Sequence, residues 1–166
     1  MSAKDDFFKK VTENKERQEA TKVQIASDTL RFTNAMHHLI QQIEVWLHKS
    51  GIDVVVTENE HHDESIMMYS GGEKLSTYRV KSCHMKNGVK KASLIPIAVY
   101  GGQKRGWASL SIDNPNRAPR NQKYLLSLSS DDVWIIKQDI VSPRAQQDNG
   151  AELTEESFFQ ALESLA

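Results

Sequence analysis

Apolar residues recur at helical spacing in the N-terminal third of the chain. From about Asp5 to Lys49 the sequence has no glycine and no proline, and from Phe32 onward its apolar positions fall three or four residues apart. This spacing predicts a helix with one apolar stripe. The stripe consists of Phe32, Met36, Leu39, Ile40, Ile43, Trp46 and Leu47. Ser50 and Gly51 end the pattern, and Gly51 can adopt the left-handed conformation that closes many helices.

The first half of this segment has a weaker pattern. Phe7, Phe8 and Val11 are followed by a polar run over residues 12–19, and the Ser27 hydroxyl could cap a new helix. We therefore expect a loose first helix or a break near Ser27. Because the apolar spacing is not held over three heptads, we expect the segment to cover a sheet rather than to form a coiled coil.

Strand-like runs follow one another from Leu75 to Ile140 without a helical pattern between them. Asn87-Gly88 lies between two long runs, residues 75–86 and 89–100, which is a strong local signal for a β-hairpin. Pro96 lacks an N–H group, so its strand needs an edge or a bulge at that position. The other expected strands are Val54–Val56, Ser65–Tyr69, Trp107–Ile112, Tyr124–Ser129 and Val133–Val141.

A second helix is expected over residues 154–165, with Thr154 as its N-cap. The predicted fold class is therefore α+β. A long N-terminal helical segment and a short C-terminal helix pack on an antiparallel β-meander of about five to seven strands. We treat residues 1–166 as a single domain, in which residues 1–10 could fray.

The composition is that of an ordinary globular chain. The chain is 39% hydrophobic and 26% charged, and its mean hydropathy is -0.55. The longest apolar run, Leu94–Tyr100, is far shorter than the roughly 20 residues that span a bilayer, and residues 1–10 lack the apolar core of a secretory signal. One cysteine, Cys83, excludes an intramolecular disulfide and fits a reducing compartment. We expect a cytoplasmic protein without membrane association.

The charge is unevenly distributed along the chain. Residues 1–71 carry 8 basic and 12 acidic side chains, residues 72–123 carry 11 and 2, and residues 124–166 carry 2 and 8. A basic surface made from the middle segment would attract phosphates or an acidic protein. The structural alternative is a solvated sheet face across which the acidic ends of the chain lie.

Candidate catalytic and metal-binding groups do not form a recognisable motif. His61 and His62 lie in the acidic run Glu58–Glu64, but adjacent histidines do not converge on one ion without further ligands. In a strand, Cys83 and His84 point to opposite faces, which is the wrong geometry for a thiolate–imidazole pair. We therefore expect no enzyme activity, no cofactor and no metal site, with Cys83 as a small buried residue. A metal-dependent hydrolase centred on His61 and His62 remains an alternative.

These observations favour a non-catalytic protein-binding module, such as a stoichiometric inhibitor, an immunity-type protein or an adaptor. The expected contacts are basic and aromatic residues together with the acidic run, because aromatic and arginine side chains dominate many interfaces. These candidates are Arg79, Lys81, Lys104, Arg105, Trp107, Arg117, Arg120, Glu58, Glu60 and Glu64. The alternative is a nucleic-acid-binding protein that uses residues 72–123, and the long helix leaves a homodimer open.

Overall fold

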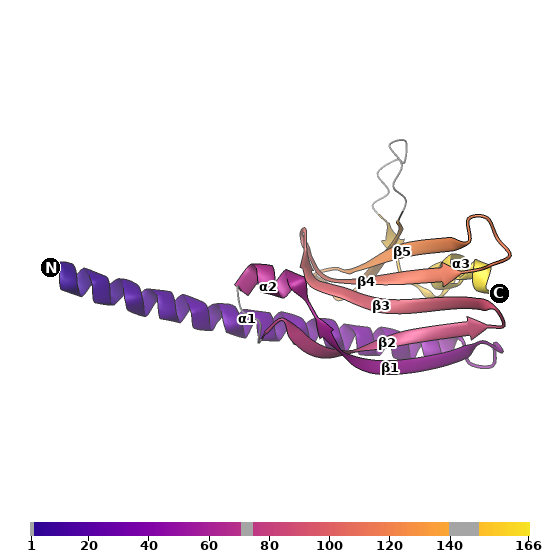
Figure 1. Cartoon of the computed structure of the whole chain (residues 1–166), viewed down its shortest axis with the longest axis horizontal. Helices are drawn as coiled ribbons and strands as arrows, with labels where there is room; N and C mark the ends of the chain where they lie inside the picture. The colour runs from indigo at the N-terminus through magenta and orange to yellow at the C-terminus, as the bar shows by residue number, and fades with distance from the viewer. Residues whose placement is uncertain (1, 71–74, 140–149) are drawn as a thin grey trace, which may run out of the picture.

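Seven antiparallel strands follow one another in chain order and form one sheet in the computed structural model (Figure 1). The structure describes residues 2–70, 75–139 and 150–166. The elements are α1 (Ala3–Trp46), β1 (Asp53–His62), α2 (Glu64–Ser70), β2 (Thr77–Asn87), β3 (Lys90–Gly101), β4 (Lys104–Asp113), β5 (Asn121–Leu128), β6 (Trp134–Gln138), β7 (Ala151–Glu152), α3 (Glu155–Ala161) and the 3₁₀ turn η1 (Glu163–Leu165). The predicted α+β class with an antiparallel meander is confirmed.

The N-terminal segment is one unbroken helix. α1 runs from Ala3 to Trp46, so the predicted break or loose turn near Ser27 is wrong. Residues 12–22 are mostly good helix formers, and the docked second half supplies the helical nucleus that an isolated peptide lacks. The helix ends at Trp46, and the chain then reverses through Lys49 and Gly51, which have φ angles of 63° and 87°.

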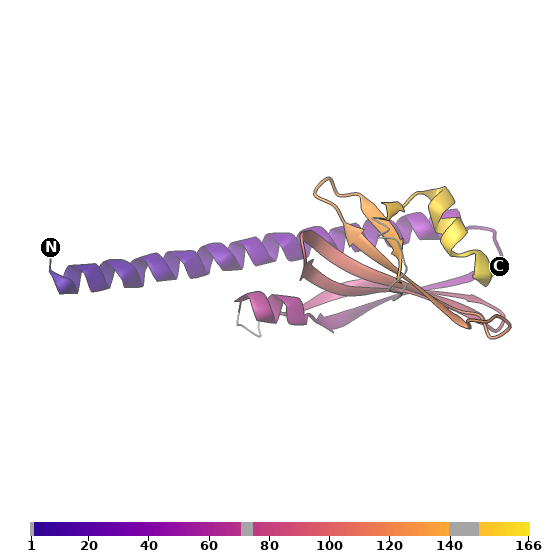
Figure 2. The same ribbon diagram turned by 90° about the horizontal axis from the view of Figure 1, so that it is seen from above.

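The core lies between one face of the sheet and the helices α1 and α3, which Figure 2 shows on the same side. Phe32 of α1 is completely buried, and its ring meets Tyr78 of β2 at 6.3 Å and Trp134 of β6 at 6.4 Å between centroids. At the other end Trp46 packs on Phe158 of α3 at 5.2 Å. The second half of α1 therefore contacts an early strand, β2, as well as the late elements β6 and α3.

The predicted hairpins are confirmed with small shifts. Asn87 pairs with Lys90, so the loop between β2 and β3 is Gly88-Val89, and only Gly88 has a positive φ. This is the pattern of a type II′ turn rather than the Asn-Gly type I′ turn. The register of β3 on β4 shifts at Pro96, which confirms the predicted bulge.

The C-terminal helix is also confirmed in part. The Thr154 hydroxyl caps α3 by accepting a hydrogen bond from the Ser157 N–H, but the α-helix ends at Ala161 and continues only as the 3₁₀ turn η1. Phe158 and Leu165 are buried beneath it. The end of the predicted Val133–Val141 strand lies outside the described residues.

The segment between β1 and β2 differs from the prediction. β1 continues to His62, so Glu58 and Glu60 lie on a strand rather than in an acidic loop. The predicted strand Ser65–Tyr69 is wrong, because this segment is the helix α2. Asp63 explains the difference: its carboxylate accepts hydrogen bonds from the Ser65 N–H at 2.9 Å and from the Ser65 hydroxyl at 2.5 Å, as an N-cap does.

α2 lies where the sheet divides. β2 pairs with β3 only over Cys83–Asn87. Residues 77–82 of β2 pair only with β1, and residues 95–101 of β3 pair only with β4. We call this division the fork. Side chains supply the missing partners: Val99 N–H donates to Asp63 at 2.8 Å, Tyr100 N–H donates to the Ser65 hydroxyl at 3.1 Å, and the His61 Nε2 lies 2.8 Å from the Ile97 carbonyl oxygen.

Asp63 holds both sides of the fork together. Its side chain is completely buried, and besides Ser65 and Val99 it accepts a hydrogen bond of 2.7 Å from the Tyr78 hydroxyl of β2. Burial, together with the neighbouring Asp63 carboxyl group, raises the pKa of Tyr78 well above its ordinary value of 10.0. One carboxylate therefore links the β1–α2 turn to β2 and to β3.

Replacing Asp63 is expected to destabilise the protein strongly. In Asp63→Ala the Tyr78 hydroxyl and the Val99 N–H lose their acceptor inside the protein, which costs about 1–3 kcal/mol for each group. We expect the free energy of unfolding, measured by urea denaturation, to fall by about 3–5 kcal/mol. Asp131→Ala is the matched control, because that aspartate is exposed in a surface turn and its loss should cost at most about 1 kcal/mol. Equal losses in the two variants would contradict the role of Asp63.

Tyr78 should also make the stability depend on alkaline pH. Its pKa is higher in the folded than in the unfolded chain, so above pH 10.0 the unfolded chain loses this proton first and stability falls as pH rises. Urea denaturation of the wild type and of Tyr78→Phe at pH values below and above 10.0 isolates this contribution. The wild type should lose more stability than the variant, and parallel losses would show that Tyr78 does not contribute.

Candidate protein-binding surfaces

The first half of α1 extends away from the rest of the molecule (Figures 1 and 2). Ile25 is the first buried residue of the helix, so residues 3–24 form an exposed segment that we call the arm. At 1.5 Å per residue the arm is about 33 Å long. Within the described chain, its hydrogen bonds and ring contacts join residues of α1 or the N-cap Ser2. Among the described residues, no hydrogen bond, ion pair or ring contact therefore joins the arm to another element.

The tip of the arm exposes two aromatic rings. Phe7 is 63% exposed and Phe8 is 56% exposed, and Val11 lies one turn further along the same region. The Lys4 ammonium group lies 5.5 Å from the centroid of the Phe8 ring. Phe7 and Ile25 are separated by 18 residues, which is five turns of an α-helix. The Phe7 side chain therefore points to the same side of the helix as Ile25, which enters the core. The sequence signal was the adjacent pair of phenylalanines before a long polar run.

Local interactions support the arm as a helix. Ser2 and Asp5 form a capping box at its first turn, and Glu19 and Lys22 form an exposed ion pair at 3.4 Å. Each interaction is worth only a few tenths of a kcal/mol to about 1 kcal/mol. The docked second half of α1 removes the cost of nucleation, so the arm continues a helix that already exists.

The second feature is the sheet face opposite α1 and α3, which we call the open face. It carries the side chains that alternate with the buried ones on β1 to β6, and no described helix covers it, although α2 lies at one end (Figure 2). The side chains of the open face are Val55, Thr57, Ser82, His84, Ser93, Ile95, Trp107, Ser109, Ser111, Leu125, Ser127 and Ile135. Of these, Ser82 and Ser127 are only 8% and 7% exposed.

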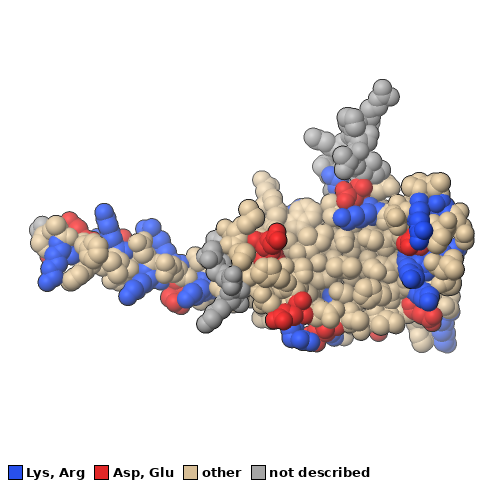
Figure 3. All heavy atoms as spheres, viewed as in Figure 1, with Lys and Arg blue, Asp and Glu red and all other residues tan. Residues whose placement is uncertain are grey.

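The middle of the open face has no charged side chain (Figure 3). The strand registers show rows such as Ile95–Ser109–Leu125 and Trp107–Ser127–Ile135, in which serine separates apolar residues. Val55 and Ile95 are 56% and 43% exposed. Charged residues lie at the borders, where Lys137 and Lys123 continue two of the rows.

The predicted acidic and basic contact residues lie opposite each other on neighbouring strands. Glu58 of β1 pairs in register with Lys81 of β2, and Glu60 pairs with Arg79. Arg79 also lies 4.0 Å from Glu58, and the Lys81 ammonium group lies 2.9 Å from Nδ1 of His37 on α1. These two predicted surfaces are therefore one mixed surface.

The remaining basic candidates are divided between the two ends of the sheet. Lys104 and Arg105 begin β4, where the Arg105 guanidinium lies 5.2 Å from the Tyr100 ring centroid. Arg117 and Arg120 lie in the loop after β4, at the opposite end. The ten predicted residues thus do not share one face. Trp107 is the one that lies on the open face, where its indole N–H donates to the Gly101 carbonyl oxygen at 3.0 Å, and Glu64 begins α2.

Acidic residues pair with part of the basic middle segment. Arg120 donates to both carboxylate oxygens of Asp113, at 2.6 and 3.2 Å, and this contact holds the pKa of Asp113 below its ordinary value. Lys123 lies 3.7 Å from Asp139. In the border row of the open face, Lys86 lies opposite Asp53 and Lys91 lies opposite Asp113 in the strand register. Carboxylates therefore lie beside several of the basic residues in the folded chain.

The described residues contain no group of three or more histidine, cysteine, aspartate and glutamate side chains that could hold a metal ion. His61 and His62 belong to the end of β1, and the His61 ring packs on Tyr78 at 5.5 Å. Cys83 is completely buried, and burial, reinforced by Glu44, raises the pKa of its thiol to about 11. A thiol with this pKa is a poor nucleophile at neutral pH.

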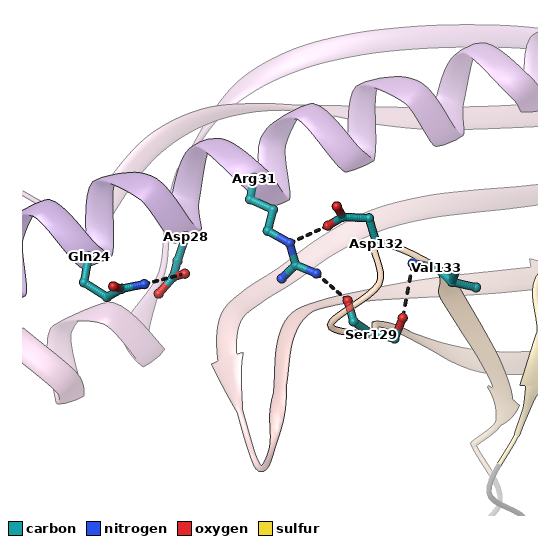
Figure 4. Close-up of polar contacts among 6 residues, drawn as sticks. All are labelled: Gln24, Asp28, Arg31, Ser129, Asp132 and Val133. Atoms are coloured by element: carbon teal, nitrogen blue, oxygen red, sulfur yellow. Dashed lines mark hydrogen bonds and ion pairs between the residues drawn. The ribbon is translucent and has the colours of Figure 1, made fainter.

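A groove runs along α1 beside the turn between β5 and β6. Arg31 anchors this turn by donating hydrogen bonds to the Asp132 carboxylate and to the Ser129 carbonyl oxygen (Figure 4). The groove has a volume of about 810 Å³ and a mixed lining of apolar residues, amide side chains and the Arg31–Asp132 ion pair. Its lining includes Asn34, Ala35, His38, Leu39, Gln42, Trp46 and Trp134.

Comparisons with known proteins provide no relative for this chain. No family model, no curated protein and no solved structure matches it. Among the described residues, no helix combines the length and the apolar character needed to cross a membrane. The arm and the open face are therefore the features from which a function can be argued.

Proposed function

We propose that this chain is a non-catalytic protein-binding module, acting as an inhibitor, immunity-type protein or adaptor, and that the tip of its arm enters an apolar groove of the partner protein. The observation that carries the proposal is the exposure of Phe7 and Phe8 at the end of α1 that projects from the core. Large exposed apolar groups on a folded chain mark interaction sites. An amphipathic helix end with adjacent aromatic anchors is suited to binding in a groove.

The charges of the arm suit a protein partner. Within residues 3–24, six lysine or arginine and five aspartate or glutamate residues alternate along the helix. A mixed surface of this kind can form the polar rim around a buried aromatic contact. Phosphate backbones favour a surface of one sign instead, and Arg79, Arg120 and Lys123 of the basic middle segment already lie beside carboxylates.

The charged residues predicted from sequence fit this proposal as secondary contacts. Lys104 and Arg105 begin β4 at the end of the sheet from which the arm extends, where a partner held by the arm could reach them (Figure 1). Arg117 lies in the loop at the opposite end. Rim charges of this type mainly accelerate association and select among partners. The tip supplies the greater part of the proposed binding energy, since two buried phenyl rings remove a large apolar area from water.

The tip is tested by the double variant Phe7→Ala/Phe8→Ala. Truncating two aromatic anchors should cost roughly 3 kcal/mol, or about a hundredfold in affinity. The tagged wild type should capture a stoichiometric protein from native lysate, with or without nuclease treatment, and the variant should lose it. Titration calorimetry with the partner identified by mass spectrometry then measures the loss.

The matched control is Asn14→Ala/Gln18→Ala, which changes two exposed polar residues of the same arm. It should retain the partner, and both variants should melt at the wild-type temperature because neither changes the core. Undiminished capture by the phenylalanine variant would contradict the role of the tip. Recovery of nucleic acid, with proteins that are lost after nuclease treatment, would favour the alternative of a nucleic-acid-binding protein.

The helical form of the arm is tested by Ala20→Pro. Proline in a helix interior costs about 3 kcal/mol, so the arm should separate from the docked part of α1 as a disordered segment. Circular dichroism should show less helix, binding of the partner should weaken, and the core should melt as before. Ala3→Pro is the control, because Ala3 is the first helical residue and proline is accepted there. Equal binding by both variants would show that the arm need not be helical.

A further inference from the structure

The open face lacks the usual character of a solvated sheet surface. An antiparallel sheet with one face in water normally alternates buried apolar residues with outward polar ones, including charges. Here the outward residues in the middle rows are serine, isoleucine, leucine and tryptophan. Charge depletion at the centre with a charged border is the composition of a protein interface (Figure 3).

The outward side chains differ in size, so the surface of this face has raised and recessed positions that can fit a second copy of the same face. Ser109 lies between Ile95 and Leu125 in one row, and Ser127 lies between Trp107 and Ile135 in the next. The small serines leave depressions between larger apolar groups. Two sheets that pack face to face interdigitate side chains of this kind across a layer about 10 Å thick.

The charges at the border also allow self-association. A two-fold axis brings the side chains nearest to it against their own copies, so a charge at the centre of the face would oppose itself. The middle of the open face has no such charge. Its border carries Asp53 and Asp113 beside Lys86, Lys91, Lys123 and Lys137, so aspartates of one copy can lie against lysines of the other.

The area is sufficient for a weak dimer. With its charged border included, the open face covers six strands about 4.8 Å apart and about six residues at about 3.3 Å on each, which outlines roughly 500 Å². Two copies would bury at least twice this area, which reaches the level of about 1,000 Å² that separates specific interfaces from incidental ones. The expected affinity is therefore micromolar rather than nanomolar.

We propose that two copies of this chain pack their open faces together as a two-fold dimer. The inference stands on the open face and does not depend on the arm. It leaves the arm of each copy, which belongs to the opposite side of the sheet, available to the partner proposed above.

The test is sedimentation equilibrium of the full chain over a concentration series through the micromolar range. The wild type should show a monomer–dimer equilibrium. Ser109→Arg places two new positive charges in the interface, where like charges in contact cost several kcal/mol, so the dissociation constant should rise at least about tenfold. Ser109→Ala, which adds neither charge nor bulk, should retain the dimer, and Leu125→Glu should dissociate it like Ser109→Arg.

Asn14→Arg is the matched control, because it adds the same charge to an exposed position on the arm. It should leave the dimer unchanged, and circular dichroism should show every variant folded. A wild type that remains monomeric overturns the proposal, as does a dimer that tolerates both Ser109→Arg and Leu125→Glu. The variant Phe7→Ala/Phe8→Ala separates the two proposals, since it should lose the partner protein and keep the dimer.

Discussion

The Asp63 carboxylate is the contact on which the arrangement of the sheet depends. β2 and β3 separate beyond Cys83, and two strands that separate leave backbone groups that would otherwise be buried without partners. Asp63 satisfies groups from both sides and starts α2 in the same place. Because Asp63 joins the two sides of the fork, β1 and β2 can pack along α1 while β3 to β6 extend the sheet towards α3.

The sequence predicted those parts of the fold that local chemistry determines. Helical spacing located the docked half of α1, Gly88 located the hairpin, and Pro96 located the bulge. It did not predict α2, because a cap provided by Asp63 gains its strength from burial beside Tyr78, which is distant in sequence. It also did not predict an unbroken α1, since the polar run after Val11 has no apolar spacing of its own.

The candidate site was harder to predict, because residues of like charge that are close in the sequence do not necessarily lie together on the surface of the folded chain. The basic middle segment and its acidic neighbours come together in antiparallel pairs such as Glu60–Arg79 and Asp53–Lys86. The register of the strands decides this neutralisation. Of the predicted residues, Trp107 lies on the open face, whereas the exposed Phe7 and Phe8 were visible in the sequence only as a weak apolar start to a helix.

The length of the arm fixes a direction as well as a distance. A flexible linker would allow its end to sample all orientations, but an α-helix without glycine or proline sets the angular position of every residue relative to the core. One residue inserted between Val11 and Ile25 would advance the tip by 1.5 Å and rotate it by about 100°. The two phenylalanines would then point to a different side of the molecule, so the number of residues in the arm is itself part of the geometry that a binding partner encounters.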